Sequence, residues 1–332
     1  SDVAEVLINA LQPLVEDDFA KTHGRIKNGA MAIIAFGKMG GREKTPTSDL
    51  DLIFIYDFDK AVEKSDGKKP LAPSQYFSRL SQRLINALSA PTAEGSLYEV
   101  DMRLRPSGSS GPIATTLESF GAYQKNEAWI WEHMALTRAR AISGPANLKK
   151  ACDDIIHQVL TAKRDPEKLV IAVCDMRERI YKEHGTDTPW AIKHYRGGLV
   201  DVEFISQYLQ LLHGNAKPGV LSANTRMALI KMGELGILKN DVSANLVAAL
   251  DMWQSIQGLV RLTTVHEMRK KHDYVLPESL NKLFFQAANV KTLEQLEEKM
   301  QKTAAMVVQI YDAIIKKPAD IARQHIDPEQ IK

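Results

Sequence analysis

The chain has 332 residues, of which 44% are hydrophobic and 25% charged, and its 43 Lys and Arg residues nearly balance 41 Asp and Glu residues. This composition excludes a disordered, collagen-like or disulfide-scaffold chain, and a formal net charge of +2 argues against a nucleic-acid partner or an anionic membrane surface. No apolar run reaches the ~18 residues that a membrane-spanning helix needs. The length predicts two domains, and two cysteines, Cys152 and Cys174, indicate a reducing, cytoplasmic compartment. Because the chain begins at Ser1, we expect a processed chain or an excised piece.

The first part of the chain mixes helical and strand periodicities. Helices are predicted where apolar residues recur three or four apart, and strands where short runs are rich in β-branched residues or alternate between apolar and polar. The elements predicted in chain order are a helix over 1–20, a strand over 31–36, a glycine-rich turn, a strand over 50–56, an exposed loop over 59–73, a helix over 74–88, a half-buried strand over 97–104, a turn over 107–112 and a short strand over 113–116.

From residue 117 onward the periodicity is mostly helical. We place a domain boundary near residue 145 and predict an α+β protein: a small mixed-sheet domain with flanking helices over residues 1–145, followed by an all-α helical bundle over residues 146–332 that recognises a substrate or regulator. The predicted helical segments are 117–138, 147–184, 197–213, 222–235, 240–270, 277–288 and 291–316, several of them separated by Gly or Pro turn signals.

Two carboxylates stand two residues apart where the second predicted strand begins. Asp49 and Asp51 would share one face of that strand, because successive strand side chains point to opposite faces, while Leu50 and Leu52 point into the core. Two rigidly held carboxylates cannot easily both be ionised unless a cation neutralises them, and hard oxygen donors suit Mg²⁺ above all. Asp101, on the polar face of the later strand, would complete the set. A merely solvated pair at a strand edge is the structural alternative.

Glycines and arginines near these carboxylates suit a phosphate group. Gly37, Gly40 and Gly41 allow a tight turn whose backbone N–H groups can approach phosphate oxygens closely. Arg103 and Arg105 follow the third aspartate by two and four residues, so they would lie on its face of the predicted strand and meet negative charge. Three carboxylates, a glycine turn and paired arginines together predict phosphoryl or nucleotidyl transfer with two metal ions.

The ordered set of motifs resembles a known family. GKMGGREKTPTSDLDLIFIYD is similar to the signature of the nucleotidyltransferase superfamily, whose fold is a small mixed sheet with flanking helices. A closer resemblance, to the glutamine synthetase adenylyltransferase family, is carried from about residue 30 to at least residue 235 by FGKMGGRE, SDLDLIF, YEVDMRLRPSGSSG, YQKNEAWIWEHMALTRAR and GGLVDVEFISQYL. Members commonly carry two such units, an amino-terminal one that removes AMP from glutamine synthetase and a carboxy-terminal one that attaches it. The last two motifs are similar to the attaching unit, since the removing unit usually has Arg-Glu in place of Val200-Asp201.

The resemblance implies an isolated carboxy-terminal unit that transfers AMP from ATP to a tyrosine hydroxyl of glutamine synthetase, releases pyrophosphate and so regulates nitrogen assimilation. It implies two Mg²⁺ or Mn²⁺ ions held by Asp49, Asp51 and Asp101, with Asp101 also the candidate acceptor of the phenolic proton. A PII signal protein and glutamine are the implied regulators. The residues that would bind the triphosphate or counter its charge are Gly37, Lys38, Gly40, Gly41, Ser48, Arg103 and Arg105.

Three other functions share part of this pattern. The AMP-removing unit, which works by phosphorolysis, would share the whole metal site. A non-catalytic module that senses PII or glutamine would retain the helical domain beside a decayed site, against which the intact aspartates argue. A nucleic-acid polymerase of the same superfamily is disfavoured because no broad basic surface is evident.

The remaining motifs are given mainly structural interpretations. Trp129, Trp131 and His133 are predicted to pack in the core, and Glu132 could reach the cleft without its spacing requiring it. His266-Glu267 begins like a zinc-protease helix, but the next histidine is six residues on, which excludes the usual spacing of three or four on one helical face. The basic run over 269–272 is interpreted as a solvated helix face. Gly197 to Glu203 is typical of a helix start, and the resemblance places it at the nucleotide cleft, with a plain inter-helix turn as the alternative.

Overall fold

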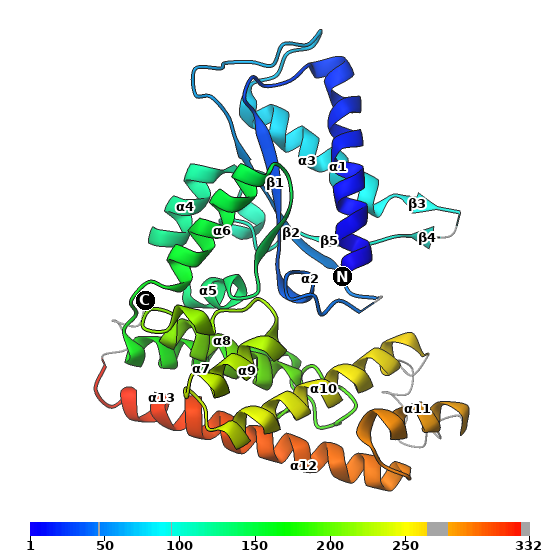
Figure 1. The fold of residues 1–332 in the computed structure, drawn as a ribbon, viewed down its shortest axis with the longest axis vertical. Helices are drawn as coiled ribbons and strands as arrows, with labels where there is room; N and C mark the ends of the chain where they lie inside the picture. The colour runs from blue at the N-terminus through cyan, green and yellow to red at the C-terminus, as the bar shows by residue number, and fades with distance from the viewer. Residues whose placement is uncertain (46, 94, 264–277, 327–332) are drawn as a thin grey trace. The chain divides into compact units, whose positions relative to one another are not determined.

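The computed structural model describes residues 1–326 apart from residues 46, 94 and 264–277 (Figure 1). Contacts divide the chain into two compact units, the first made of residues 1–44 and 48–160 and the second of residues 45–47 and 161 onward. The division follows helix α6 (Ala146–Leu160), whereas the sequence places the boundary near 145. The reason is that α6 contacts strands β1 and β7 of the sheet, so it belongs with the first unit.

The first unit is built on a five-stranded mixed sheet. Its path runs β5-β2-β1-β7, with β6 also paired to β2; β1 is antiparallel to both β2 and β7, while β5 and β6 run parallel to β2. A separate two-stranded ribbon is formed by β3 (Pro91–Thr92) and β4 (Gly95–Ser96). The strands of the larger sheet are β1 (Ala30–Ala35), β2 (Leu50–Asp57), β5 (Val100–Asp101), β6 (Ala114–Thr116) and β7 (Arg140–Ser143).

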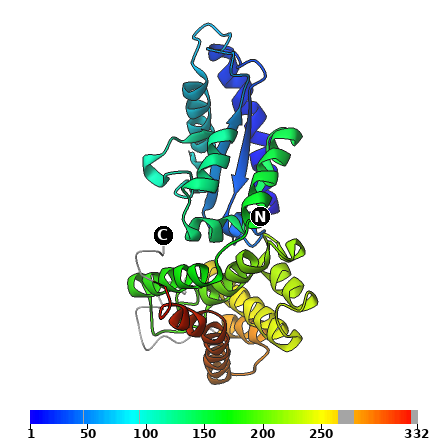
Figure 2. The same cartoon turned by 90° about the vertical axis from the view of Figure 1, so that its left-hand side faces the viewer.

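Helices pack on the sheet of the first unit because its central strands are apolar on both faces. Met31 and Ile33 of β1 join a core cluster with buried residues of α1 (Asp2–His23) and α3 (Pro73–Ser89), while the alternate residue Ile34 is equally buried but lies outside that cluster. Helix α4 contacts β2 and β6, helix α6 contacts β1 and β7, and the two helices contact each other (Figures 1 and 2). The other helices of this unit are α2 (Gly37–Gly40), η1 (Gly108–Ser110), α4 (Leu117–Asn126) and α5 (Ile130–Leu136).

The described part of the second unit is helical. Its buried residues include Trp253, whose indole Nε1 donates to the carbonyl oxygen of Gly197 at 3.1 Å. None of the helices within the described ranges is long and apolar enough to cross a membrane. The helices are α7 (Pro166–His184), α8 (Leu199–His213), η2 (Pro218–Val220), α9 (Thr225–Glu234), α10 (Asn240–Leu262), α11 (Glu278–Ala288), α12 (Leu293–Tyr311), η4 (Asp312–Lys316) and α13 (Lys317–Ala322).

The α+β class is confirmed, as are the strands at 31–36 and 50–56, the short strand at 113–116 and the helices at 1–20 and 74–88. The predicted strand over 97–104 is wrong beyond its centre, because only Val100 and Asp101 pair with a neighbour. The predicted helix over 147–184 is two helices, since Asp165 caps a new helix that begins at Pro166. Strand β7 and helix α13 were missed.

Candidate functional site

A single helical turn, α2, forms the connection between β1 and β2, where the sequence predicted a plain glycine-rich turn. Gly37 has a φ of 54°, which a residue with a side chain rarely adopts, and an added Cβ would lie 2.5 Å from Oδ2 of Asp51. At Gly40 an added Cβ would lie 1.9 Å from the carbonyl oxygen of Arg138. Gly37 is therefore required by the close approach of a carboxylate, and Gly40 by the close approach of neighbouring backbone.

Two of the three predicted carboxylates lie on neighbouring strands where β2 begins. Asp51 on β2 is the register partner of Asp101 on the parallel strand β5, and the preceding pair is fixed by a 2.8 Å bond from Leu50 N–H to the Glu99 carbonyl. Leu50 is fully buried, as its predicted inward direction requires, whereas Asp51 is half-buried. Asp49 precedes the strand and is exposed. The fold thus places Asp51 and Asp101 side by side, with the glycine turn against Asp51.

Both oxygens of the Asp101 carboxylate are bonded by Arg103. The backbone N–H of Arg103 donates to Oδ1 at 2.8 Å, and its guanidinium Nε and Nη2 lie 2.7 Å and 2.5 Å from Oδ2. Partial burial acts to raise the pKa of Asp101, but the hydrogen bonds and charge of Arg103 outweigh it and lower the pKa overall. The Arg103 side chain is 85% exposed, so this is a surface ion pair that solvent screens.

Arg105 is held by the backbone of its own loop. Its guanidinium donates to the carbonyl oxygens of Met102 at 2.9 Å, Ser109 at 3.1 Å and Gly111 at 3.2 Å. These bonds curl the chain into a turn directly after β5. The expectation that Arg103 and Arg105 project from one strand face is therefore wrong, because neither residue belongs to a strand.

The donor chemistry of this edge fits a hard divalent cation, because Asp49, Asp51 and Asp101 offer only carboxylate oxygens. Yet within the described ranges no group of three or more His, Cys, Asp or Glu side chains is gathered closely enough to hold a metal ion. Lys38, on α2, and Ser48 are both half-buried, and the Lys38 carbonyl accepts a 2.8 Å bond from Glu43 N–H. The elements that carry the predicted residues are thus brought together, while a closed three-carboxylate cluster is not.

Comparison with known proteins relates both halves of the chain to nucleotidyltransferases. Residues 1–155 match the family model described as glutamate-ammonia ligase adenylyltransferase, and residues 171–315 match that described as GlnD PII-uridylyltransferase. Bifunctional glutamine synthetase adenylyltransferase/adenylyl-removing enzymes of Bradyrhizobium diazoefficiens and Rhodopseudomonas palustris are 41% identical over 95% of the chain. Over nearly its whole length, the chain is thus similar to glutamine synthetase adenylyltransferases.

The similarity extends over nearly the whole of this chain but only part of each relative. The enzyme of Xanthobacter autotrophicus, for example, is 41% identical over 323 residues, which are 96% of this chain and 32% of the relative. The chain therefore spans about a third of the length of the curated relatives it matches. The resemblance seen in the motifs between residues 30 and 235 is confirmed and extended toward both ends.

Asp201 is an interior residue of the helical unit. Its side chain is 0% exposed and accepts bonds from Arg177 Nε at 2.6 Å, Arg196 Nη1 at 3.1 Å and the backbone N–H of Gly197 at 2.5 Å. The Arg177 side chain is itself only 1% exposed. Asp201 therefore neutralises buried arginines, which agrees with the alternative interpretation of this motif as a structural inter-helix turn.

Around helix α5 the structure reverses the predicted exposure. Trp129 and Trp131 are 57% and 37% exposed, whereas Glu132 is buried, accepting from the Tyr123 hydroxyl at 2.8 Å and from Trp129 N–H at 2.9 Å. Glu132 thus caps the start of α5 instead of reaching a cleft. His133 is half-buried, its Nε2 lying 2.8 Å from a backbone carbonyl. The residues at 266–272 lie outside the described part of the chain.

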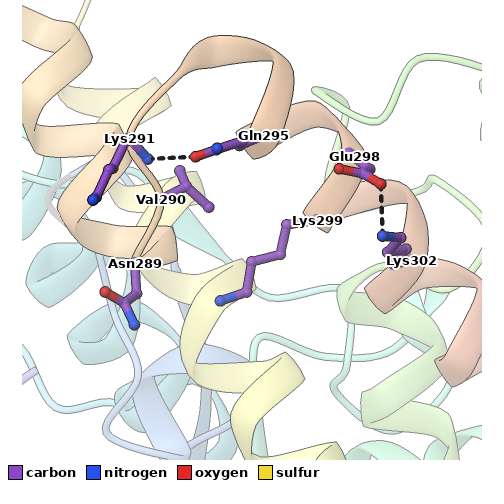
Figure 3. A pocket seen from close by; sticks show the side chains of 7 residues that line it. All are labelled: Asn289, Val290, Lys291, Gln295, Glu298, Lys299 and Lys302. Carbon is purple, nitrogen blue, oxygen red and sulfur yellow. Dashed lines mark hydrogen bonds and ion pairs between the residues drawn. The ribbon is translucent and has the colours of Figure 1, made fainter.

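A cavity of about 500 Å³ lies at the turn between α11 and α12, away in sequence from every predicted site residue (Figure 3). Three of its charged groups have protein partners: Lys302 pairs with Glu298 at 2.6 Å, and Lys299 Nζ donates to the Ala288 carbonyl at 2.6 Å. Gln295 bonds the backbone of Lys291 at 2.9 Å. These contacts close the α11–α12 turn.

Proposed function

We propose that this chain transfers AMP from ATP to a tyrosine hydroxyl of glutamine synthetase and releases pyrophosphate. The observation that carries the proposal is the approach of the α2 glycine turn to Asp51, which is itself the register partner of Asp101. A phosphate-binding turn beside paired carboxylates is what nucleotidyl transfer requires, because catalysis there consists of positioning the phosphate and neutralising its charge. The family relationship supports the same reaction.

The carboxylates of the first unit would bind metal ions and accept a proton. Asp49, Asp51 and Asp101 would hold two divalent cations, Mg²⁺ or Mn²⁺, which when bound supply Lewis-acid activation of the hydroxyl and neutralise the leaving pyrophosphate. A tyrosine hydroxyl has a pKa of about 10 and needs its proton removed. Asp101 is the candidate acceptor of that proton: Arg103 keeps its carboxylate ionised, and the lowered pKa also makes it a weaker base.

Phosphate binding would fall to the turn that connects β1 to β2. Backbone N–H groups at Gly37, Gly40 and Gly41, with Ser48 and Lys38, would bind the triphosphate, and the small side-chain-free surface of the glycines lets it approach. Arg103 is the more exposed cation of the two and could counter the charge of the phosphates beside Asp101, whereas Arg105 would act mainly by fixing the loop. Its three carbonyl bonds leave little of its guanidinium for a ligand.

We further propose that the first unit has the nucleotidyltransferase arrangement and that the helical unit carries recognition and regulation in the cytoplasm. The antiparallel β1–β2 pair with carboxylates at the start of β2 supports the former. The match of residues 171–315 to a model named for PII-uridylyltransferase supports PII, with glutamine, as the regulatory signal.

One assay separates the proposed direction from its nearest alternative, phosphorolytic removal of AMP. The purified chain is given unmodified glutamine synthetase with ATP and Mg²⁺ in one reaction, and adenylylated glutamine synthetase with inorganic phosphate in another, and the mass of the target subunit is followed. We expect gain of one AMP in the first reaction and no change in the second. Loss of AMP in the second reaction alone would assign the removing activity, and no change in either would support a sensing module.

A further inference from the structure

An ion-pair bridge joins the first turn of α1 to the glycine turn. The guanidinium of Arg140, on β7, forms two parallel bonds to Glu5, Nη1 to Oε1 at 2.9 Å and Nη2 to Oε2 at 2.5 Å. Its remaining donor, Nε, bonds the carbonyl oxygen of Gly40 at 2.9 Å. One planar side chain therefore connects an acidic residue of α1 to the backbone of the turn that bears the phosphate-binding glycines.

Two more contacts tie the same helix turn to the segment after Gly40. Arg42 lies 3.7 Å from Asp2 and 3.9 Å from Glu5, and the backbone N–H of Lys44 donates to the Ser1 hydroxyl at 3.1 Å. Ser1, Asp2 and Glu5 all belong to the start of α1. The start of α1 is thus linked to this segment at three residues, to Gly40 through Arg140 and directly to Arg42 and Lys44.

The bridge is stronger than an ordinary surface ion pair. Glu5 and Arg140 are 22% and 21% exposed, so solvent screens them only partly, and a bidentate guanidinium–carboxylate pair is among the stronger charge-assisted bonds. The Arg140 hydrogen bonds lower the pKa of Glu5 despite its partial burial. The buried Arg138 also pairs with Glu43, three residues after Gly40, at 2.5 Å. Several ion pairs therefore fix the segment at the carboxy-terminal end of the turn.

We propose that Glu5 and Arg140 are positioning residues that hold the glycine turn in its nucleotide-binding conformation, a role that rests on the proposed function. Glycines have wide conformational freedom, so a turn rich in them loses more entropy on binding a ligand unless it is already ordered. By fixing the Gly40 carbonyl, Arg140 removes that cost before ATP arrives. Neither residue needs to touch the nucleotide.

The proposal is tested with Glu5→Gln, Arg140→Gln and the double variant, beside a matched control on the same helix. The control is Asp18→Asn, which removes a 2.9 Å pair with Arg83 at the far end of α1. We measure the KM for ATP and kcat of AMP transfer, the Kd of MgATP by calorimetry, and hydrogen exchange over residues 37–44. Each single variant should raise KM and Kd about tenfold, equivalent to ~1.4 kcal/mol, with kcat within about twofold. The double variant should add little to either single one, because the two residues act as one bridge.

The variant Arg140→Lys distinguishes a loss of turn order from a general folding defect. Lysine keeps the positive charge for Glu5 but lacks the planar fork that also reaches Gly40, so this variant should remain folded, exchange faster over 37–44 and still bind MgATP several-fold more weakly. Wild-type Kd and exchange in Arg140→Lys, or in both glutamine variants, would overturn the proposal, as would an equal loss in Asp18→Asn. If the wild type itself failed to transfer AMP, the proposed function would fall, while exchange over 37–44 would still show whether the bridge orders the turn.

Discussion

Replacing Asp201 with Asn should destabilise the helical unit severely without touching the reacting groups. Asp201 is the acceptor for Arg177, Arg196 and the Gly197 backbone N–H, and both it and Arg177 are almost fully buried. Asparagine is neutral and turns an N–H₂ group toward these donors. The change therefore leaves the Arg177 charge buried without a counter-charge.

The expected magnitude follows from that burial. Removing one partner of a buried ion pair costs about 3–5 kcal/mol, because the remaining charge stays desolvated. Arg196 is 29% exposed and can turn to solvent, so we expect the lower part of that range, about 3 kcal/mol of unfolding free energy. The matched control is Asp251→Asn, which breaks a 3.1 Å pair with Arg226 at the surface and should cost at most about 1 kcal/mol.

Urea unfolding followed by tryptophan fluorescence measures both variants. Trp253 is fully buried in the same unit and donates to the carbonyl of Gly197, the residue whose N–H is bonded by Asp201, so its emission reports on this cluster. A loss in Asp201→Asn no larger than that in Asp251→Asn would refute the reasoning. So would an unchanged unfolding midpoint accompanied by loss of AMP transfer, because that pattern belongs to a residue that acts in the reaction.

Three further predictions concern other parts of the chain. Gly40→Ala should lower the free energy of unfolding of the first unit by about 2 kcal/mol or more, seen as a lower unfolding temperature, because the added Cβ would lie 1.9 Å from a carbonyl oxygen. Gly258→Ala is the control and should leave the unfolding temperature unchanged, because its Cβ would have no neighbour within 4 Å. The lowered pKa of Glu5 means that its stabilising contribution is present above pH 4.5 and is lost as the pH falls through the folded value; acid titration of unfolding should therefore be steeper in the wild type than in Glu5→Gln, and equal slopes would contradict the bridge. Burial and the nearby lysine charge lower the pKa of His194 from 6.5 to about 4, so the native state binds fewer protons than the unfolded chain in that range and stability should fall as the pH drops through it; His194→Gln should flatten this slope.

Local patterns predicted the central elements because those elements depend on local burial. The apolar run over residues 31–36 and the Leu50–Leu52 alternation place side chains in a core whatever their partners are, and the structure buries them. The alternation over 97–104 failed as a strand predictor, because alternation does not show where pairing ends. There the side chain of Arg105 bonds three carbonyls and turns the chain away from β2.

The aspartates and glycines of the candidate site could be predicted from the sequence, but the residues that hold them in place could not. Spacing pointed to Asp49 and Asp51 beside a glycine turn, but Asp49 lies before β2, and it is the parallel pairing of β5 with β2 that places Asp101 beside Asp51. Arg140 could not be found this way, because it lies 135 residues from Glu5 and 100 from Gly40, and only the pairing of β7 with β1 brings them together. The buried role of Asp201 was likewise hidden, since a carboxylate near a helix start is usually solvated.

AMP transfer from ATP labelled at the α-phosphate, with the wild type, Asp51→Asn and Asp49→Asn assayed side by side on glutamine synthetase, tests the central claim most directly. We predict that the wild type labels the target and that each asparagine variant loses at least ~100-fold in rate while keeping the wild-type unfolding temperature, because charge stabilisation by either carboxylate is worth ~3 kcal/mol or more. Near-native labelling by either folded variant, or no labelling by the wild type, would contradict the claim.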